Sequence, residues 1–99
     1  MSSKAKSQIL HARMRIRERF DLDLKDDEMQ SLANRIKKSY LDKHKGKAQF
    51  VDRQSLRVSR WFVWFREQWF PVVYDNNRKT IVTVLPKGAL GPEPEPLTE

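Results

Sequence analysis

The sequence predicts an α+β fold, with two N-terminal helices packed on a three- to four-stranded antiparallel sheet and a disordered C-terminal tail. The first observation is that apolar residues recur at spacings of three and four up to Tyr40, as on the buried face of a helix. The second is that short β-branched and aromatic runs, separated by turn residues, follow Gly46. Helices followed by strands along the chain are typical of this fold class.

The first helix is expected from Ser7 to Phe20. A serine at the start of a helix can accept hydrogen bonds from the free amides of the first turn, which makes Ser7 a suitable N-cap. Ile9, Ala12 and Ile16 follow at helical spacing and would bury one face. The polar residues before Ser7 are expected to be frayed.

A second helix is expected from Asp26 to Gly46. Asp26, Asp27 and Glu28 begin it, where negative charge suits the positive end of the helix dipole. Lysines gather towards its other end, where cations are favourable, and Gly46 is a common helix stop. The apolar positions that would face the core are Met29, Leu32, Ala33, Ile36 and Tyr40.

The rest of the chain has the composition of strands, turns and a tail. The expected strands are residues 48–52, 56–66, 69–75 and 80–86. Asn76 and Asn77 can adopt the positive φ that tight hairpins require, and Pro71, which lacks an amide hydrogen, favours an edge position or a bulge. One domain, residues 7–86, is therefore expected, followed by an acidic, proline-rich segment, residues 87–99, with little to bury.

Composition limits the classes of function. A chain of 99 residues forms one small domain, and it contains no cysteine, which excludes disulfides and thiolate metal sites and fits a reducing compartment. No apolar run approaches the roughly 20 residues that span a bilayer. No long apolar stretch follows the N-terminal lysines, as a secretory signal would require. We therefore expect a cytoplasmic protein without membrane contact.

The net charge of +7 is unevenly distributed along the chain. Residues 87–99 contain one lysine and three glutamates, so the remaining residues, 1–86, have a net charge of +9. A domain this basic attracts polyanions, and nucleic acids are the commonest of these in a cell. RNA is therefore the expected partner, although an acidic protein would suit the same charge.

One histidine stands in a series of arginines at residues 11–19, HARMRIRER. On a helix, His11, Arg15 and Arg19 form one stripe beside the apolar face. Neighbouring cations favour the neutral form of a histidine, whose ordinary pKa is roughly 6.5. His11 could then take a proton from a ribose 2′-OH while the arginines bind the phosphate, which is metal-independent RNA cleavage by transesterification. A solvated basic face with a structural histidine fits the same spacing.

The predicted strand 56–66 combines aromatic rings with Arg57, Arg60 and Arg66. Alternation along a strand would place Trp61, Val63 and Phe65 on one face and Arg60, Phe62, Trp64 and Arg66 on the other. If the second face is uncovered, its rings and cations suit single-stranded RNA. They suit a protein-binding surface equally well, and a core with a charged rim is the third alternative.

A basic loop, DKHKGK at residues 42–47, contains Lys43, His44 and Lys45. These residues could contact RNA phosphates, and His44 could supply a second proton-transfer group. An exposed loop whose lysines complement the helix dipole is the alternative. The histidines and carboxylates lack metal-ligand spacing, and neither a glycine-rich phosphate loop nor a GxSxG motif is present. No cofactor or metal is therefore expected.

Two stretches of the chain together resemble a known superfamily. HARMRIRERF reads His-Ala-x-x-Arg-x-x-x-Arg at the start of a helix, and VVYD at 72–75 precedes IVTVLP at 81–86. These resemble the two ends of the small nuclease-fold domains of the barnase–EndoU–colicin–RelE-like superfamily, and the resemblance spans about residues 8–86. It implies two helices followed by an antiparallel sheet, and a ribonuclease of the toxin or phage-encoded type.

Carried over by position, the resemblance implies that His11 is a general base or acid and that Arg15 and Arg19 contact phosphate. Thr83, on the last strand, would be a polar group at the cleft, although a threonine there is equally well a strand former. The sequence thus predicts an endoribonuclease. The alternative is a non-catalytic basic protein on the same fold that binds RNA or inhibits a host nucleic-acid-binding protein. A cognate inhibitor is a further candidate partner, and the oligomeric state is not predicted.

Overall fold

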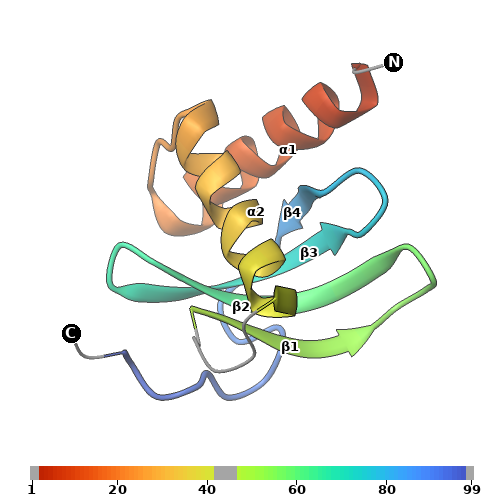
Figure 1. Ribbon diagram of the computed structural model, residues 1–99. Coiled ribbons are helices and arrows are strands. Elements are labelled where there is room, and N and C mark those ends of the chain that lie inside the picture. Colours follow the sequence, from red (N-terminus) through yellow and green to blue (C-terminus); the bar gives the residue numbers. More distant parts are fainter. Residues whose placement is uncertain (1–2, 42–46, 98–99) are drawn as a thin grey trace.

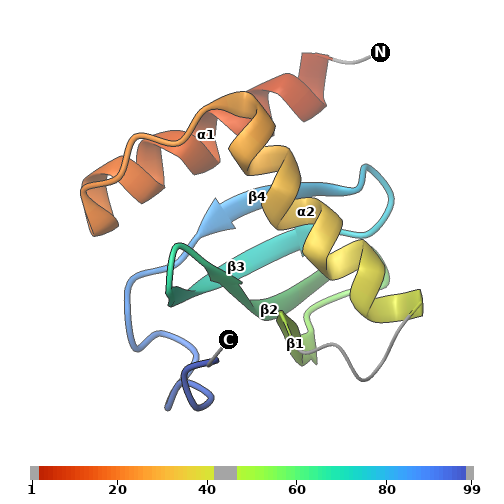
Figure 2. The same ribbon diagram turned by 60° about the vertical axis from the view of Figure 1, so that its left-hand side comes forward.

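The computed structural model describes residues 3–41 and 47–97, in which two helices precede a four-stranded antiparallel sheet (Figure 1). The elements are α1 (Ser3–Phe20), α2 (Asp26–Leu41), β1 (Ala48–Arg53), β2 (Val58–Phe65), β3 (Gln68–Asp75) and β4 (Thr80–Val84). The strands lie side by side in chain order, so β1 and β4 are the edges. Both helices lie on one face of the sheet, and the segment after β4 crosses the other face (Figures 1 and 2). The predicted α+β class is confirmed.

Helix α1 begins at Ser3, earlier than predicted. Ser7 is exposed inside the helix and does not cap it, so the prediction of an N-cap there is wrong. The reason is that the lysines and alanine at residues 4–6 are good helix formers, and nothing in them stops a helix. Ala12 and Ile16 are fully buried, as the apolar spacing predicted.

Helix α2 begins at Asp26, as predicted. Oε1 of Glu28 accepts a hydrogen bond of 3.0 Å from the backbone amide of Lys25, which is one half of a capping box. This amide, followed by the guanidinium of Arg66, holds the pKa of Glu28 below its ordinary value. The described helix ends at Leu41, and the predicted stop at Gly46 lies outside the described residues.

The main core lies between the helices and the sheet. Among its fully buried side chains are Tyr74 and Phe70 of β3 and Ile16 of α1. Phe20 of α1 meets Phe70 edge to face, with 4.8 Å between the ring centroids. Burying one large apolar side chain contributes about 1.5–3 kcal/mol, so this layer supplies most of the stability. The two helices are thereby held on the sheet, with α1 along β4 and α2 across β1, β2 and β4.

A second, smaller cluster lies on the opposite face of the sheet. Residues of β2 alternate between the two faces as predicted, with Trp61 in the main core and Phe62 and Trp64 in the second cluster. Trp69 of β3 completes this cluster. The helices cannot cover it, because they lie on the other side of the sheet.

The C-terminal segment, predicted to be disordered, covers this second cluster. Residues 87–97 form no helix or strand, but Leu90 and Leu97 pack against the aromatic rings. Nε1 of Trp69 also donates a hydrogen bond of 3.1 Å to the carbonyl oxygen of Glu95. The composition suggested disorder because two leucines among prolines and glutamates bury little alone. Together they cover rings that the rest of the fold leaves exposed.

The two later hairpins contain residues with positive φ, and in the second of them these are not the residues predicted. Arg66 and Glu67 form a two-residue turn between β2 and β3, with φ of 51° and 63°. Between β3 and β4 the positive φ of 60° belongs to Lys79 and not to Asn76 or Asn77, so that prediction is wrong. A longer loop ends in one left-handed residue there, whereas a tight two-residue hairpin would have needed two.

Pro71 lies in the interior strand β3, opposite Phe62 of β2, and not in an edge strand or a bulge as predicted. Its carbonyl oxygen accepts a hydrogen bond of 2.7 Å from the amide of Leu85, just beyond the end of β4. The backbone nitrogen of Pro71, which has no hydrogen to donate, faces this same side, where the ladder with β4 stops at Val84. A proline is tolerated there because it removes no bond from a continuing ladder.

Candidate nucleic-acid interface

The exposed surface of α1 is the main candidate site. Residues four apart on a helix share one stripe, so α1 places His11, Arg15 and Arg19 in a row about 12 Å long. His11 and Arg19 are exposed, and the side chain of Arg15 is 38% exposed. These three residues are termed the basic row. The predicted stripe is therefore present and reachable by a ligand.

Arg19 joins the basic row to the edge strand β4. Its Nη1 donates a hydrogen bond of 2.7 Å to the carbonyl oxygen of Val84. That oxygen is available because the next residue, Leu85, bonds to Pro71, which turns the carbonyl of Val84 away from β3. Helix α1 accordingly runs along β4 in both views (Figures 1 and 2). The basic row lies beside the outer edge of the sheet.

The arginines of α1 differ in how their charge is balanced. Nη1 of Arg13 lies 3.0 Å from Oδ1 of Asp26, in an ion pair towards α2. Nη1 of Arg15 lies 2.8 Å from Oε1 of Glu18, within α1 itself. In the described part of the chain, no carboxylate pairs with Arg17. Exposed ion pairs contribute only about 0–1 kcal/mol, so a phosphate can replace Glu18 beside Arg15 at small cost.

The structure does not bring Thr83 to the basic row. Thr83 pairs with Val73 of β3, and its side chain lies on the face opposite to that of Val84, which belongs to the main core. An irregularity in the β3–β4 ladder leaves Val82 without a partner between Ile81 and Thr83. Thr83 is half-buried on the side of the sheet away from the helices.

A buried carboxylate connects the N-terminal half of α1 to the turn between β3 and β4. Oδ2 of Asp75 accepts hydrogen bonds from Gln8 of α1 at 3.3 Å and from Nη1 of Arg78 at 2.8 Å. Oδ1 accepts hydrogen bonds from the backbone amides of Asn77 and Arg78, both of 2.9 Å. Gln8 in turn accepts a hydrogen bond from the hydroxyl of Thr80. This network joins α1 to the β3–β4 turn by side-chain hydrogen bonds, in addition to the packing of the core.

The environment of Asp75 keeps its carboxylate charged. Burial alone would raise the pKa, since its side chain is only 1% exposed. The backbone amide and guanidinium of Arg78 outweigh burial, and Gln8 adds to their effect, so the pKa of Asp75 lies below its ordinary value. Nε of Arg57 is 3.8 Å from Oδ2 of the same carboxylate. An aspartate opening a turn is a recognisable sequence signal, but its partner Gln8, 67 residues away, is not.

Arg60 and Arg66 were also predicted to contact RNA. Each pairs with a carboxylate, and the two pairs lie on opposite sides of the sheet. Nε of Arg60 donates a hydrogen bond of 2.7 Å to Asp52 of β1, a bond that raises the pKa of Arg60. Arg66 pairs with Glu28 of α2, on the helix side. The prediction that Arg60 and Arg66 share one face is therefore wrong. Strand alternation ends before Arg66, which lies in the turn with positive φ.

The remaining predicted contacts are covered or not described. Trp64 lies on the predicted face, but it is only 9% exposed because the C-terminal segment covers it. Lys43, His44 and Lys45 lie outside the described residues. The basic row is thus the part of the predicted site that the structure places in line on one exposed surface, whereas Arg57 and Arg66, 52% and 46% exposed, lie apart from each other beside carboxylates.

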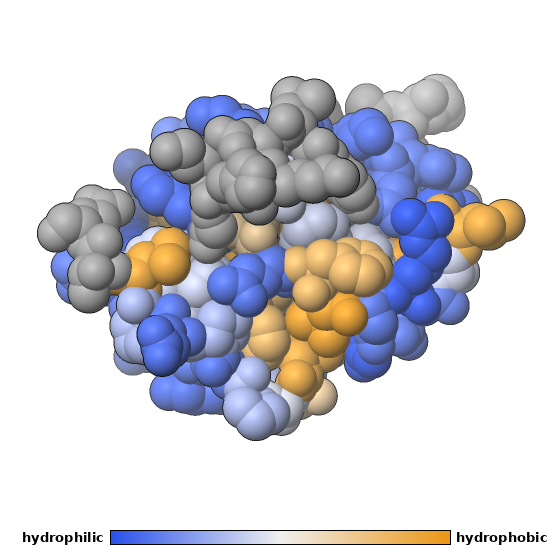
Figure 3. All heavy atoms as spheres, turned by 60° about the horizontal axis from the view of Figure 1, so that its bottom comes forward, coloured by the Kyte–Doolittle hydropathy of each residue, from blue (hydrophilic) through white to orange (hydrophobic). Residues whose placement is uncertain are grey.

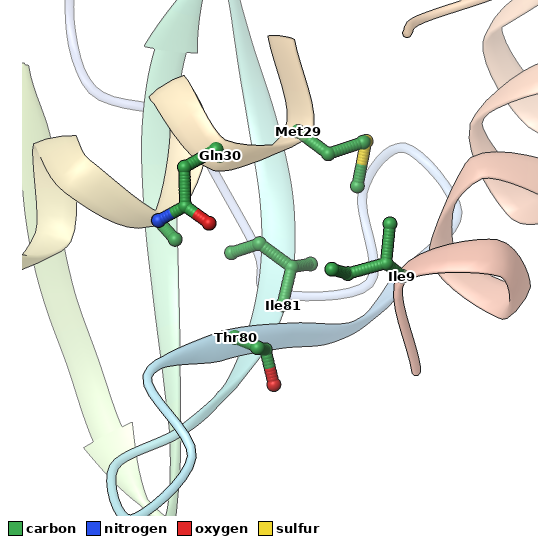
Figure 4. Close-up of a pocket in the computed structure, with 6 residues that line it drawn as sticks. Ile9, Met29, Gln30, Thr80 and Ile81 are labelled. Carbon is green, nitrogen blue, oxygen red and sulfur yellow. The ribbon is translucent and has the colours of Figure 1, made fainter. Parts of the chain in front are cut away.

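A small hollow opens between α1, α2 and β4 (Figure 4). Its cavity volume is about 10 Å³, room for about one water molecule, whereas ligand pockets commonly have roughly 300–1,000 Å³. The residues that line it are mostly apolar: Ile9, Met29, Gln30, Ala33, Thr80 and Ile81. It is too small and too apolar to be a phosphodiester site.

In the part of the chain that the structure describes, no three acidic or histidine side chains gather as metal ligands. Neither described helix is long and apolar enough to cross a membrane. Comparison with protein-family models, with curated proteins and with solved structures gave no match in any of the three.

Proposed function

We propose that this protein binds RNA in the cytoplasm through the outer surface of α1, with the basic row contacting phosphates. The observation that carries the proposal is the row itself: His11, Arg15 and Arg19 lie in line on one exposed helix. A line of cations suits a linear polyanion, and phosphate contacts supply most of the sequence-independent affinity for nucleic acids. The charge of +9 over residues 1–86 strengthens the attraction at longer range.

Ribonuclease activity at the same row is the second candidate. It is favoured by the position of His11 one turn from Arg15, and by the helix–helix–sheet order that the superfamily resemblance implies. His11 would remove the proton from the 2′-OH, whose oxygen attacks the phosphorus while the bond to the 5′-oxygen breaks and that oxygen takes a proton from water. The products would be a 2′,3′-cyclic phosphate and a 5′-OH. Thr83 takes no part in this scheme, since its side chain lies on the other face of the sheet.

Affinity for a labelled single-stranded RNA tests the binding proposal. Arg15→Gln is expected to weaken binding roughly 3- to 10-fold, because it removes a phosphate contact worth about 1 kcal/mol. Arg13→Gln is the matched control: it removes the same charge from the same helix, but Arg13 lies outside the basic row, where it pairs with Asp26 of α2. Its effect should stay within about two-fold. Equal effects of the two changes would contradict a contact at the basic row.

Incubation of the same RNA in EDTA separates the two candidates. Cleavage by the wild type that leaves 2′,3′-cyclic ends and is lost in His11→Ala would establish the ribonuclease. RNA that is bound and stays intact supports binding alone. If the wild type does not bind RNA, both candidates fail and an acidic protein partner is the remaining one. Leu10 and Met14, 57% and 61% exposed on α1, would then be apolar contacts for it.

A further inference from the structure

The face of the sheet away from the helices contains three aromatic rings in mutual contact. The ring centroids of Trp64 and Trp69 are 5.2 Å apart, and those of Phe62 and Trp69 are 6.4 Å apart, both edge to face. These rings, termed the aromatic platform, are only 2–9% exposed. Figure 3 views this face, on which apolar residues gather near the middle with hydrophilic residues around them. Three such rings on one face of the sheet are a surface on which bases can stack.

The cover over the aromatic platform is residues 87–97, termed the C-terminal strap. In the described residues, the strap makes one hydrogen bond to the sheet, from the indole of Trp69 to the carbonyl oxygen of Glu95. Leu90 and Leu97 provide its apolar contacts. Its own backbone bonds, such as Gly91 to Gly88 at 3.1 Å, are local turns and do not extend the sheet. A segment held by so few contacts can leave the platform without unfolding the domain.

The C-terminal strap shares three properties with a single nucleic-acid strand. It is non-helical, it presses apolar groups on aromatic rings, and it contains Glu93 and Glu95. Residues 87–99 have a net charge of −2, opposite to the +9 of residues 1–86. The opposite net charges attract each other at long range, and a polyanion competes for the same positive charge.

We propose that the aromatic platform is a stacking site for unpaired RNA bases, and that the C-terminal strap occupies this site in competition with RNA. The proposal deepens the RNA-binding function and rests on it. Duplex RNA hides its base faces, so only single strands can displace the strap. The basic row remains accessible to both forms of RNA. With the strap in place, the protein would thus bind duplex and single-stranded RNA with similar affinity. Release of the strap would raise the affinity for the single strand alone.

The first test loosens the strap in the full-length chain. The variant is Leu90→Ser with Leu97→Ser, and the control is Leu56→Ser, which changes a leucine that is 90% exposed elsewhere. Release of the strap is measured by a red shift of tryptophan emission, and affinity is measured for a single strand and for a duplex. The double variant is expected to bind the single strand at least about 5-fold more tightly, with duplex affinity within two-fold of wild type, since stacking contributes about 1–3 kcal/mol per base.

Two outcomes for the RNA affinities would overturn the proposal. One is a red shift without any gain in single-strand affinity. The other is an equal gain for single strand and duplex, which would reflect charge alone. If the wild type binds RNA and the double variant gains nothing, the strap proposal fails while the basic row stands. Self-association of the double variant in place of RNA binding would make the platform a protein contact, which also rejects the proposal.

A second test uses the wild type and does not depend on the stability of a variant. The indole N–H of Trp69, bonded to Glu95, gives its own nuclear magnetic resonance signal. Adding a single-stranded oligonucleotide should move this signal and that of Trp64, whereas a duplex of the same sequence should not. If the oligonucleotide shifts signals of α1 and leaves both indoles unchanged, RNA does not reach the platform.

Discussion

Nη1 of Arg19 lies 2.7 Å from the carbonyl oxygen of Val84 and donates a hydrogen bond to it. This bond joins the last turn of α1 to the edge strand β4, 65 residues later in the chain. An edge strand has unpaired backbone groups that other strands can bind, and a covering side chain reduces this risk. Arg19 therefore links α1 to β4 in addition to belonging to the basic row.

Arg19→Ala is expected to lower the free energy of unfolding by about 1 kcal/mol, less than the roughly 1.5–3 kcal/mol typical of hydrogen bonds to charged groups, because Arg19 is exposed. Arg17→Ala is the control, because Arg17 is exposed on the same helix and should change stability by less than about 0.5 kcal/mol. Urea unfolding at neutral pH measures both. Equal losses would show that the bond to Val84 contributes nothing.

Asp75→Ala is expected to lower the free energy of unfolding by about 2–3 kcal/mol, because it leaves several donors without their shared acceptor. The donors are Gln8, the amides of Asn77 and Arg78, and the guanidinium of Arg78. Asp23→Ala, which removes an aspartate that is 75% exposed, should cost less than about 0.5 kcal/mol. Thermal unfolding compares the two, and a small effect of Asp75→Ala would mean that the network does not position α1.

The low pKa of Asp75 predicts a loss of stability in acid. Hydrogen bonds hold its folded pKa below the ordinary value of 3.8, so the charged form stabilises the fold above that pH. This contribution is lost as the pH falls through the folded pKa. The stability difference between the wild type and Asp75→Asn should therefore be constant from pH 7 to about pH 5 and shrink below about pH 4. Thermal unfolding as a function of pH measures it, and a difference that does not change with pH would contradict the assignment.

Glu67→Gly is expected to stabilise the protein by about 0.5–1 kcal/mol. Glu67 has φ of 63° in the β2–β3 turn, a conformation that glycine adopts without strain. Asn77→Gly is the matched control, since Asn77 does not have positive φ and gains nothing from glycine there. It should destabilise, because glycine increases the entropy of the unfolded chain. Denaturant unfolding of both variants should give shifts of opposite sign.

RNA binding through the basic row predicts a moderate dependence on salt. If two to three phosphates are contacted, the affinity for a single strand should fall roughly 7- to 20-fold between 50 and 200 mM salt. Arg15→Gln should reduce the slope of log affinity against log salt by about 0.7, one phosphate contact fewer. A wild-type slope near zero would exclude phosphate contacts as the source of affinity.

Much of the fold was predictable from residue patterns of short range. The helical spacing of Ala12 and Ile16 marked the buried face of α1, and the acidic start of α2 marked its first residue. Alternation separated Trp61 from Trp64 across the sheet. Such patterns succeed because they depend on the geometry of one helix or one strand. They also predicted the basic row, which lies within a single helix.

Other features depend on contacts between distant parts of the chain. The bonds from Gln8 to Asp75 and from Arg19 to Val84 arise only when α1 packs on the sheet. Arg66 turned towards α2 because a tight turn interrupts the alternation. No local pattern contains these pairings.

The sequence alone determined the order of helices and strands, the faces they bury and the excess of positive charge, since each follows from local periodicity and composition. Only the tertiary structure decided which cations stay open to a ligand and that the C-terminal strap covers Trp64 and Trp69. The physical reason is that the exposure of a side chain depends on which residues pack against it in the folded chain. Leu90 and Leu97 have no apolar surface to bury until the folded sheet presents one.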